Sequence, residues 1–290
     1  MASMREIKRR KGSISSISQI TKAMKLVSTV KFQKAKNNAE NSKPYFDKMY
    51  QTVSSILAKT ENITHPYLNP GTSAKKAIIT ITSNRGLAGG YNSNIVKLIK
   101  GSGFATEDVV IYAIGRKGKD ALERRGYEIK NDYSEAINAP IYRDALDIGK
   151  DVLKAFSDNE IGEIYLAYTG FKNTVTHIPK MIKLLPVEEI KDDTQETPGK
   201  SDGSEILMNY EPEPEEALTA IIPQYICSLI YGALKESVAS ENGARMTAMD
   251  NATNNAEEMI DELTLSFNRA RQGAITQEIT EIVSGSEALA

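Results

Sequence analysis

Residues 246–274 read MTAMDNATNNAEEMIDELTLSFNRARQGA and carry the pattern from which the fold can be predicted. Apolar or small residues recur here at alternating spacings of three and four, the a and d positions of a coiled coil, over about four heptads. These residues are Met246, Met249, Thr253, Ala256, Ile260, Leu263, Phe267, Ala270 and Ala274. The helical pattern extends from about residue 214 to residue 284. A helix with such a seam needs a second helix to cover it.

The covering helix is predicted at the N-terminus, where residues 3 to about 60 have helical periodicity. Its apolar stripe, which we expect to meet the C-terminal seam, consists of Ile7, Ile14, Ile17, Ile20, Met24, Val27 and Val30. Pro44 is expected to kink or break this helix. Because a whole domain separates the two helices in the sequence, an antiparallel pairing is the simplest arrangement.

The two ends of the chain carry opposite charge. Residues 1–36 hold ten Lys or Arg against one acid, about +9, whereas residues 240–290 hold nine acids against three Arg, about −6. These charges favour pairing of the two helices. A basic arm alone would also suit nucleic acid, so a coiled-coil protein that binds nucleic acid is one alternative function.

The composition excludes several classes of protein. With 290 residues, 40% hydrophobic residues, 26% charged residues and a net charge of −2, the chain is neither disordered nor collagen-like. Cys227 is the single cysteine, which excludes an intrachain disulfide and a CxxC metal site. The longest nearly apolar stretch, residues 221–234, is shorter than the roughly 20 residues that cross a bilayer. We therefore expect no transmembrane helix and a reducing, cytoplasmic-side location.

The middle of the chain alternates strands and helices. Strands are predicted at 77–83, 108–114, 127–131, 162–169 and 174–187, and helices at 91–100, 116–125 and 142–157. Such alternation predicts a mostly parallel sheet with helices on both faces. We expect four segments: a coiled-coil helix (1–60), an α/β domain (75–189), an acidic loop with a foot segment (190–212) and a second coiled-coil helix (213–290).

One glycine-rich stretch is a candidate phosphate site. Residues 84–92, NRGLAGGYN, follow a predicted strand and open a predicted helix. They lack both the GxGxxG spacing and the GK[ST] of a P-loop, so a packing turn is the favoured interpretation. A nucleotide-binding α/β enzyme remains an alternative function. His65 and His177 have no metal-binding context, and no residue is nominated as a catalytic, cofactor or metal site.

Three motifs resemble the gamma subunit of F-type ATP synthases of the bacterial type. They are ITKAM at 20–24, NRGLAGG at 84–90 and ARQGAITQEITEIV at 270–283. The resemblance covers essentially the whole chain in order. The chain departs from the family at Asn84, where Asp is usual, at Ala88, where Cys is frequent, and at Gly273, which replaces Ala or Ser. These departures concern local packing.

The resemblance implies a fold and a function. The fold is a long antiparallel coiled coil of the terminal helices plus a Rossmann-like α/β domain with a mostly parallel sheet. The implied function is that of the central rotor shaft, a non-catalytic subunit that couples rotation of the c-ring to the conformations of the catalytic beta subunits during ATP synthesis and hydrogen ion transport. The implied partners are the alpha and beta subunits, epsilon and the c-ring, at the cytoplasmic face of the cell membrane; no cofactor is implied.

The resemblance also implies contact residues. Those matching the segments that meet the alpha/beta hexamer are Lys22, Met24, Arg271, Gln272, Thr276, Gln277 and Glu278. Arg245 is added from its charge, as a partner for acidic loops of beta. Tyr210 resembles the foot segment that rests on the c-ring.

Overall fold

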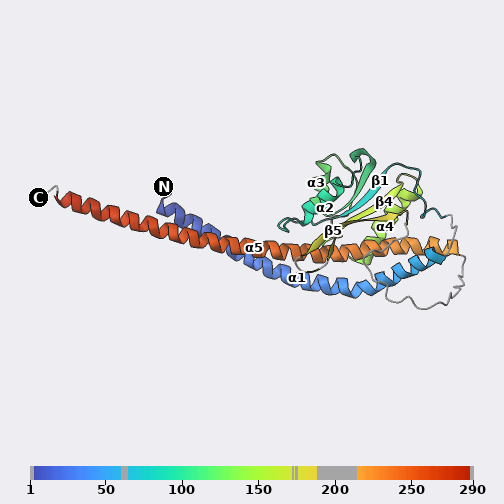
Figure 1. The fold of residues 1–290 in the computed structure, drawn as a ribbon, viewed down its shortest axis with the longest axis horizontal. Helices are drawn as coiled ribbons and strands as arrows, with labels where there is room; N and C mark the ends of the chain where they lie inside the picture. Colours follow the sequence, from blue (N-terminus) through green and yellow to red (C-terminus); the bar gives the residue numbers. More distant parts are fainter. Residues whose placement is uncertain (1–2, 60–64, 172, 174–175, 188–213, 288–290) are drawn as a thin grey trace. The chain divides into compact units, whose positions relative to one another are not determined.

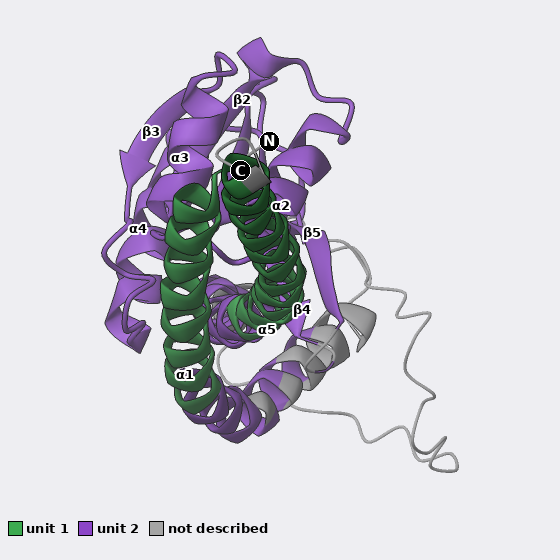
Figure 2. Cartoon of the chain, turned by 90° about the vertical axis from the view of Figure 1, so that its left-hand side faces the viewer, with its two compact units in different colours: residues 1–30, 245–290 green, residues 31–244 purple. Residues whose placement is uncertain are grey.

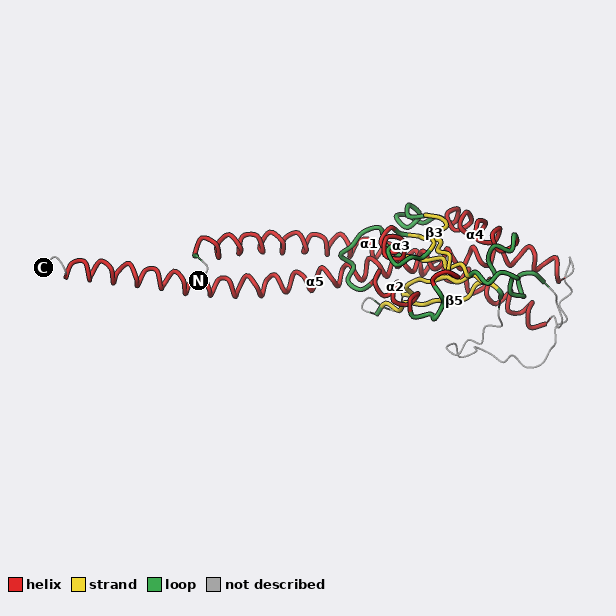
Figure 3. The backbone as a smooth tube through the Cα atoms, turned by 90° about the horizontal axis from the view of Figure 1, so that it is seen from above, coloured by secondary structure: helices red, strands yellow, loops and turns green. Residues whose placement is uncertain are grey.

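The chain forms two compact units. The computed structural model describes residues 3–59, 65–171, 173, 176–187 and 214–287. Residues 1–30 and 245–290 make up unit 1, and residues 31–244 make up unit 2 (Figure 2). The described part of unit 1 is almost entirely helical, and the strands lie in unit 2 (Figure 3). Two long helices, α1 (Met4–Lys59) and α5 (Pro214–Glu287), contribute to both units (Figure 1).

The helix α1 passes through Pro44 without ending, so the predicted alternative of a break there is wrong. An interior proline costs about 3 kcal/mol in an isolated helix, because it removes a hydrogen bond and clashes with the preceding turn. Tertiary packing on both sides of Pro44 outweighs this cost. Ala35 and Val53 are buried, and the ring of Phe46 packs edge-on against Tyr231 of α5, with centroids 6.2 Å apart.

Unit 2 contains a five-stranded sheet in the order β3-β2-β1-β4-β5. The strands are β1 (Lys76–Ile81), β2 (Val109–Ile114), β3 (Glu128–Asp132), β4 (Glu163–Phe171) and β5 (His177–Leu185). All neighbouring pairs are parallel except β4 and β5. The connecting helices are α2 (Tyr91–Lys100), the short η1 (Thr106–Asp108), α3 (Arg116–Glu123) and α4 (Tyr142–Ser157). The predicted strands and helices of this region therefore all form, with ends shifted by a few residues.

Helices cover both faces of the sheet, as predicted. Alternate residues of β1 point to opposite faces: Ile79 joins a core with α4 and the first part of α5, whereas Ile78 joins a core with α2 and α3. Close approach of α4 to α5 requires a glycine, because a Cβ at Gly149 would lie 2.5 Å from Sγ of Cys227. The sheet is therefore a packed scaffold that holds α5 on one face.

The helix α5 contains an apolar stretch of mean hydropathy 1.2 that is long enough, by length and composition alone, to cross a membrane. Half of this stretch is buried inside the structure. Leu218, Ile222 and Ile230 of α5 are fully buried in the sheet core. We interpret this apolar stretch as a core helix, whose hydropathy is explained by its contacts with the sheet.

A charge cluster joins three strands at one end of the sheet. Glu163 of β4 accepts ion pairs from Lys76 of β1 at 2.9 Å and from Lys183 of β5 at 3.0 Å, and the three side chains are about one-quarter exposed or less. Partial burial acts to raise the pKa of Glu163, but hydrogen bonds from Lys76 and Lys183 outweigh it and hold that pKa below its usual range. The carboxylate of Glu163 therefore stabilises the fold, because it lies between the ammonium groups of Lys76 and Lys183 and offsets their mutual repulsion.

We expect Glu163→Gln to lower the free energy of unfolding by about 1 kcal/mol at pH 7. Since the folded pKa of Glu163 is depressed, this contribution is fully present above the unfolded pKa and is lost as the pH falls through the folded value. The difference in the free energy of unfolding between wild type and variant should therefore shrink as the pH falls and close below the folded pKa of Glu163. Denaturant unfolding of the full chain at several pH values measures this difference in the free energy of unfolding.

Glu160→Gln is the matched control, because Glu160 pairs with Lys130 at 3.1 Å but is 53% exposed. It should change stability little at any pH. A Glu163→Gln effect of the same size at all pH values would contradict the electrostatic explanation.

Candidate functional site

The helix pair of unit 1 is the candidate site. On α5, Met249, Thr253 and Ala256 are buried, and Met246, Ile260, Leu263, Phe267 and Ala270 are half-buried. Asn251, Asn254 and Asn255, between the seam positions, are exposed. The predicted seam is therefore confirmed from residue 246 to residue 270. Ala274 is exposed, and its assignment to the seam was wrong.

The end of the seam follows from the antiparallel pairing. Thr21 meets Thr253, and Lys25 meets Asp250, so α1 and α5 run in opposite directions. Continuing this register places Met4, the first residue of α1, opposite Ala270. Ala274 therefore lies beyond the start of α1.

The apolar stripe predicted for α1 does not cover the seam. Ile17, Ile20, Val27 and Val30 are exposed by 51%, 59%, 57% and 72%. Of the predicted stripe, only Ile7 is buried, while Ile14 and Met24 are half-buried. The residues that α1 turns inward have alternating spacings of four and three and are Ile7, Lys11, Ile14, Ser18, Thr21, Lys25, Ser28, Phe32 and Ala35. Between Ile14 and Phe32 this face is entirely polar.

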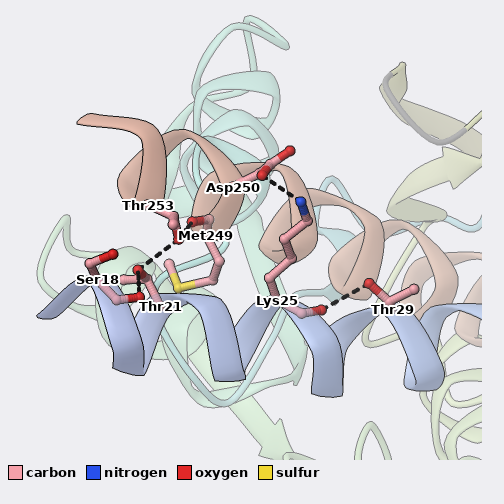
Figure 4. A network of polar contacts seen from close by, with 7 residues as sticks. All are labelled: Ser18, Thr21, Lys25, Thr29, Met249, Asp250 and Thr253. Carbon is pink, nitrogen blue, oxygen red and sulfur yellow. Dashed lines mark hydrogen bonds and ion pairs between the residues drawn. The ribbon is translucent and has the colours of Figure 1, made fainter. Parts of the chain in front are cut away.

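Polar contacts connect the two helices at this seam (Figure 4). The hydroxyl oxygens of Thr21 and Thr253 lie 2.8 Å apart, and both residues are buried. Thr21 also contacts the carbonyl of Ser18 at 3.0 Å, and Thr253 that of Met249 at 2.8 Å. Each hydroxyl has one hydrogen, so two of these three bonds form at a time. Neither buried hydroxyl is left without a partner.

An ion pair lies one turn away. Nζ of Lys25 is 2.6 Å from Oδ1 of Asp250. The two side chains are 39% and 45% exposed, so solvent screens the pair and its net contribution is below about 1 kcal/mol. Its geometry nevertheless defines which residue of α1 faces which residue of α5.

The predicted hexamer-contact residues lie on helix surfaces, where Thr276 and Gln277 line only an open hollow on one face of α5. Arg271, Gln272, Thr276, Gln277 and Glu278 occupy consecutive turns of α5 and are all exposed. On α1, Lys22 is exposed and Met24 is half-buried; Arg245 is half-buried at the point where α5 enters unit 1. Tyr210 lies outside the described residues. This arrangement suits contact with a large partner better than capture of a small molecule.

Exposed apolar residues lie among these positions. On α5, Ile275, Ile279, Ile282 and Val283 are 49–67% exposed. On α1, Ile17, Ile20, Leu26, Val27 and Val30 are 51–72% exposed. Exposed apolar residues that recur at helical spacing on a helix surface are typical of a site of protein interaction. Sequence reasoning missed these α1 residues because it assigned Ile17, Ile20, Val27 and Val30 to the seam and did not consider Leu26.

The glycine-rich loop after β1 is built as a packing turn. Oδ1 of Asn84 accepts the N–H of Arg116 at 2.9 Å, and Oγ1 of Thr82 accepts that of Gly118 at 2.9 Å. Nδ2 of Asn84 donates to the carbonyl of Ser134 at 2.7 Å. Asn84 therefore ties the loop to the N-terminus of α3 and to the segment after β3, and Thr82 ties the end of β1 to α3. Gly89 has φ of +55°, a conformation that favours glycine.

The histidines take structural positions. Nε2 of His65 lies 2.9 Å from the hydroxyl of Thr219. Burial lowers the pKa of His177, whose imidazole packs against Gly243 of α5. Within the described part of the chain, no three His, Cys, Asp or Glu residues gather as a metal site.

Asn84→Asp tests the packing turn. An aspartate at this position still accepts the N–H of Arg116 but cannot donate to the carbonyl of Ser134. A carboxylate oxygen would then face the carbonyl oxygen of Ser134 at hydrogen-bond distance, and the two would repel each other. We expect a loss of about 1–3 kcal/mol in the free energy of unfolding. Asn94→Asp, at an exposed position of α2, is the control and should have little effect. Equal stability of the two variants would contradict the packing role of Asn84.

The comparisons with known proteins agree with this geometry. The family model described as ATP synthase matches residues 3–289. The ATP synthase gamma chain of Lachnoclostridium phytofermentans is 66% identical over 291 residues and 100% of both chains, and that of Alkaliphilus metalliredigens is 45% identical over 99% of this chain and 98% of its own. A chain of the Tetrahymena thermophila mitochondrial ATP synthase central stalk and c-ring structure has a TM-score of 0.58 and 25% identity, over 80% of this chain and 99% of that one. The chain therefore belongs to the ATP synthase gamma-chain family.

Proposed function

We propose that this chain is the central rotor shaft of an F-type ATP synthase, which couples rotation of the c-ring to the conformations of the catalytic beta subunits. The observation that carries the proposal is the surface of the unit 1 helices, which combines exposed isoleucines with exposed polar and charged residues. Among the described contact residues, Thr276 and Gln277 line only an open hollow on α5. Family membership and the likeness to a central-stalk structure support it.

The helix pair supplies the asymmetry that a rotor needs. A ring of equivalent catalytic sites can hold different nucleotide affinities at one moment only if an inner element touches each site differently. The unit 1 helices differ along and around their surface. The α1 segment up to residue 30 is basic and presents Ile17, Ile20 and Val27, whereas the α5 segment is acidic overall.

The proposed contacts are individually weak. Arg271, Gln272 and Glu278 are exposed on α5 and would meet a loop of a catalytic subunit, with Lys22, Met24 and Arg245 as further contacts to the hexamer. Exposed polar side chains can exchange partners at low cost, because water replaces each lost contact. A rotor requires this property, since one strong fixed contact would hold a single angle.

The remaining assignments follow from the same proposal. Catalysis resides on the beta subunits, and this chain contributes no reacting group. Its partners are alpha, beta, epsilon and the c-ring, which Tyr210 contacts. The chain is peripheral, at the cytoplasmic face of the cell membrane, and reaches the membrane only through the complex.

Two cross-links in the assembled complex test this function. With buried Cys227 replaced by Ser, a cysteine at Glu278 is oxidised to a cysteine in the facing loop of beta. This link joins rotor to stator, so ATP hydrolysis and ion pumping should both stop and should return on reduction. Tyr210→Cys linked to a c subunit is the matched control, and both activities should survive it because the joined parts turn together.

Pumping that continues at full yield of the Glu278 link would contradict the rotor assignment. Loss of pumping on the Tyr210 link, with the hexamer intact, would also contradict it.

A further inference from the structure

The part of α1 in unit 1 carries two competing faces. The face turned toward α5 contains Ser18, Thr21, Lys25 and Ser28. The apolar residues Ile17, Ile20, Met24 and Val27 each precede one of these by a single position and have the same spacing. One residue corresponds to a rotation of about 100° around the helix axis. Turning α1 by this angle would therefore bring the apolar face into the seam.

Apolar burial alone does not choose between these faces. Ile7, Ile14 and Phe32 favour the observed face, because they occupy its seam positions. Ile17, Ile20, Met24 and Val27 favour the other face. The opposing seam of α5 would accept them, since Met249, Ala256 and Ile260 are apolar.

The polar contacts distinguish the two faces. The Thr21–Thr253 contact at 2.8 Å and the Lys25–Asp250 pair at 2.6 Å join residues of opposite helices and exist only in the observed orientation (Figure 4). Rotation by one residue would carry Thr21 and Lys25 away from α5. Polar groups at seam positions are known to specify register at some cost in stability.

We propose that Thr21–Thr253 and Lys25–Asp250 form a rotational lock, which holds α1 in the orientation that keeps Ile17, Ile20 and Val27 on the outside. These four residues are positioning residues. The lock makes an apolar surface available that the helix pair would otherwise bury. That this surface serves partner subunits rests on the proposed function, whereas the lock itself is a property of the isolated chain.

Disulfide formation in the full chain reports the orientation. With Cys227→Ser as background, one reporter carries Ser18→Cys with Ala256→Cys, positions that the antiparallel register places opposite each other in the seam. The second reporter carries Ile17→Cys with Ala256→Cys and detects the rotated helix. The ratio of the two cross-linking rates measures the balance between the orientations. It should strongly favour the Ser18 reporter in the parent chain.

Changes confined to α5 remove the lock without altering either face of α1. Thr253→Val with Asp250→Ala removes the partners of Thr21 and Lys25. It also makes the seam of α5 more apolar, so that the apolar face of α1 can pack against it. We expect the ratio to shift toward the Ile17 reporter by about tenfold, the effect of losing one hydrogen bond and one screened ion pair. A cysteine at Ile20, without the other reporters, should also react more slowly with a maleimide, because it becomes buried.

The controls separate rotation from unfolding. Thr253→Ser keeps the hydroxyl and should keep the parent ratio, as should Glu257→Ala at an exposed position of α5. Asp250→Lys should shift the ratio, and adding Lys25→Asp should restore it by reversing the pair. Helicity by circular dichroism should remain at the parent level in all of these variants.

An unchanged ratio in the Thr253→Val and Asp250→Ala chain, with helicity retained, would overturn the proposal, because the apolar residues alone would then set the orientation. Failure of the charge reversal to restore the ratio would overturn the part assigned to Lys25–Asp250. No partner subunit is used, so these results are independent of the rotor assignment.

Discussion

The antiparallel pairing of α1 with α5, along a seam that is apolar on α5 and polar on the middle of α1, is the interaction on which the properties of unit 1 depend. An ordinary coiled coil buries its apolar residues on both helices. Here α1 buries Ser18, Thr21 and Ser28 and leaves Ile17, Ile20 and Val27 in solvent. The helix pair therefore buries less apolar surface than it could, and Ile17, Ile20 and Val27 stay available for contact with other proteins.

Much of the fold could be predicted from periodicity. The α5 seam and the alternating strands of unit 2 have strong patterns, and the structure follows both. The α1 register could not be predicted by choosing the most apolar stripe. That rule assumes that apolar burial within the chain determines which face of α1 turns toward α5. The spacing from Ile7 and Ile14 to Phe32 and Ala35 was the available signal, since it keeps one strict heptad register through the polar positions. The break considered at Pro44 does not occur for a related reason, because packing outweighs the local cost of the proline.

The candidate site was less predictable than the fold. A helix surface that binds a partner has no conserved geometry of reacting groups, so residues such as Gln272 and Glu278 were identified by resemblance alone. The structure adds that they are exposed and lie close together on one helix. The loop after β1 illustrates the opposite case. Its glycines suggested a phosphate site, whereas the side chain of Asn84 ties the loop to the N–H of Arg116 at the start of α3 and to the carbonyl of Ser134, as a packing turn does.

Direct observation of rotation tests the central claim. In the Cys227→Ser background, exposed Lys117 of α3 would be replaced by cysteine and attached to a bead, in a complex whose alpha and beta subunits are fixed to a surface. The rotor account predicts that the bead turns in one direction when ATP is added and stops when ATP is exhausted. A bead that stays still while the same molecules hydrolyse ATP would contradict the account.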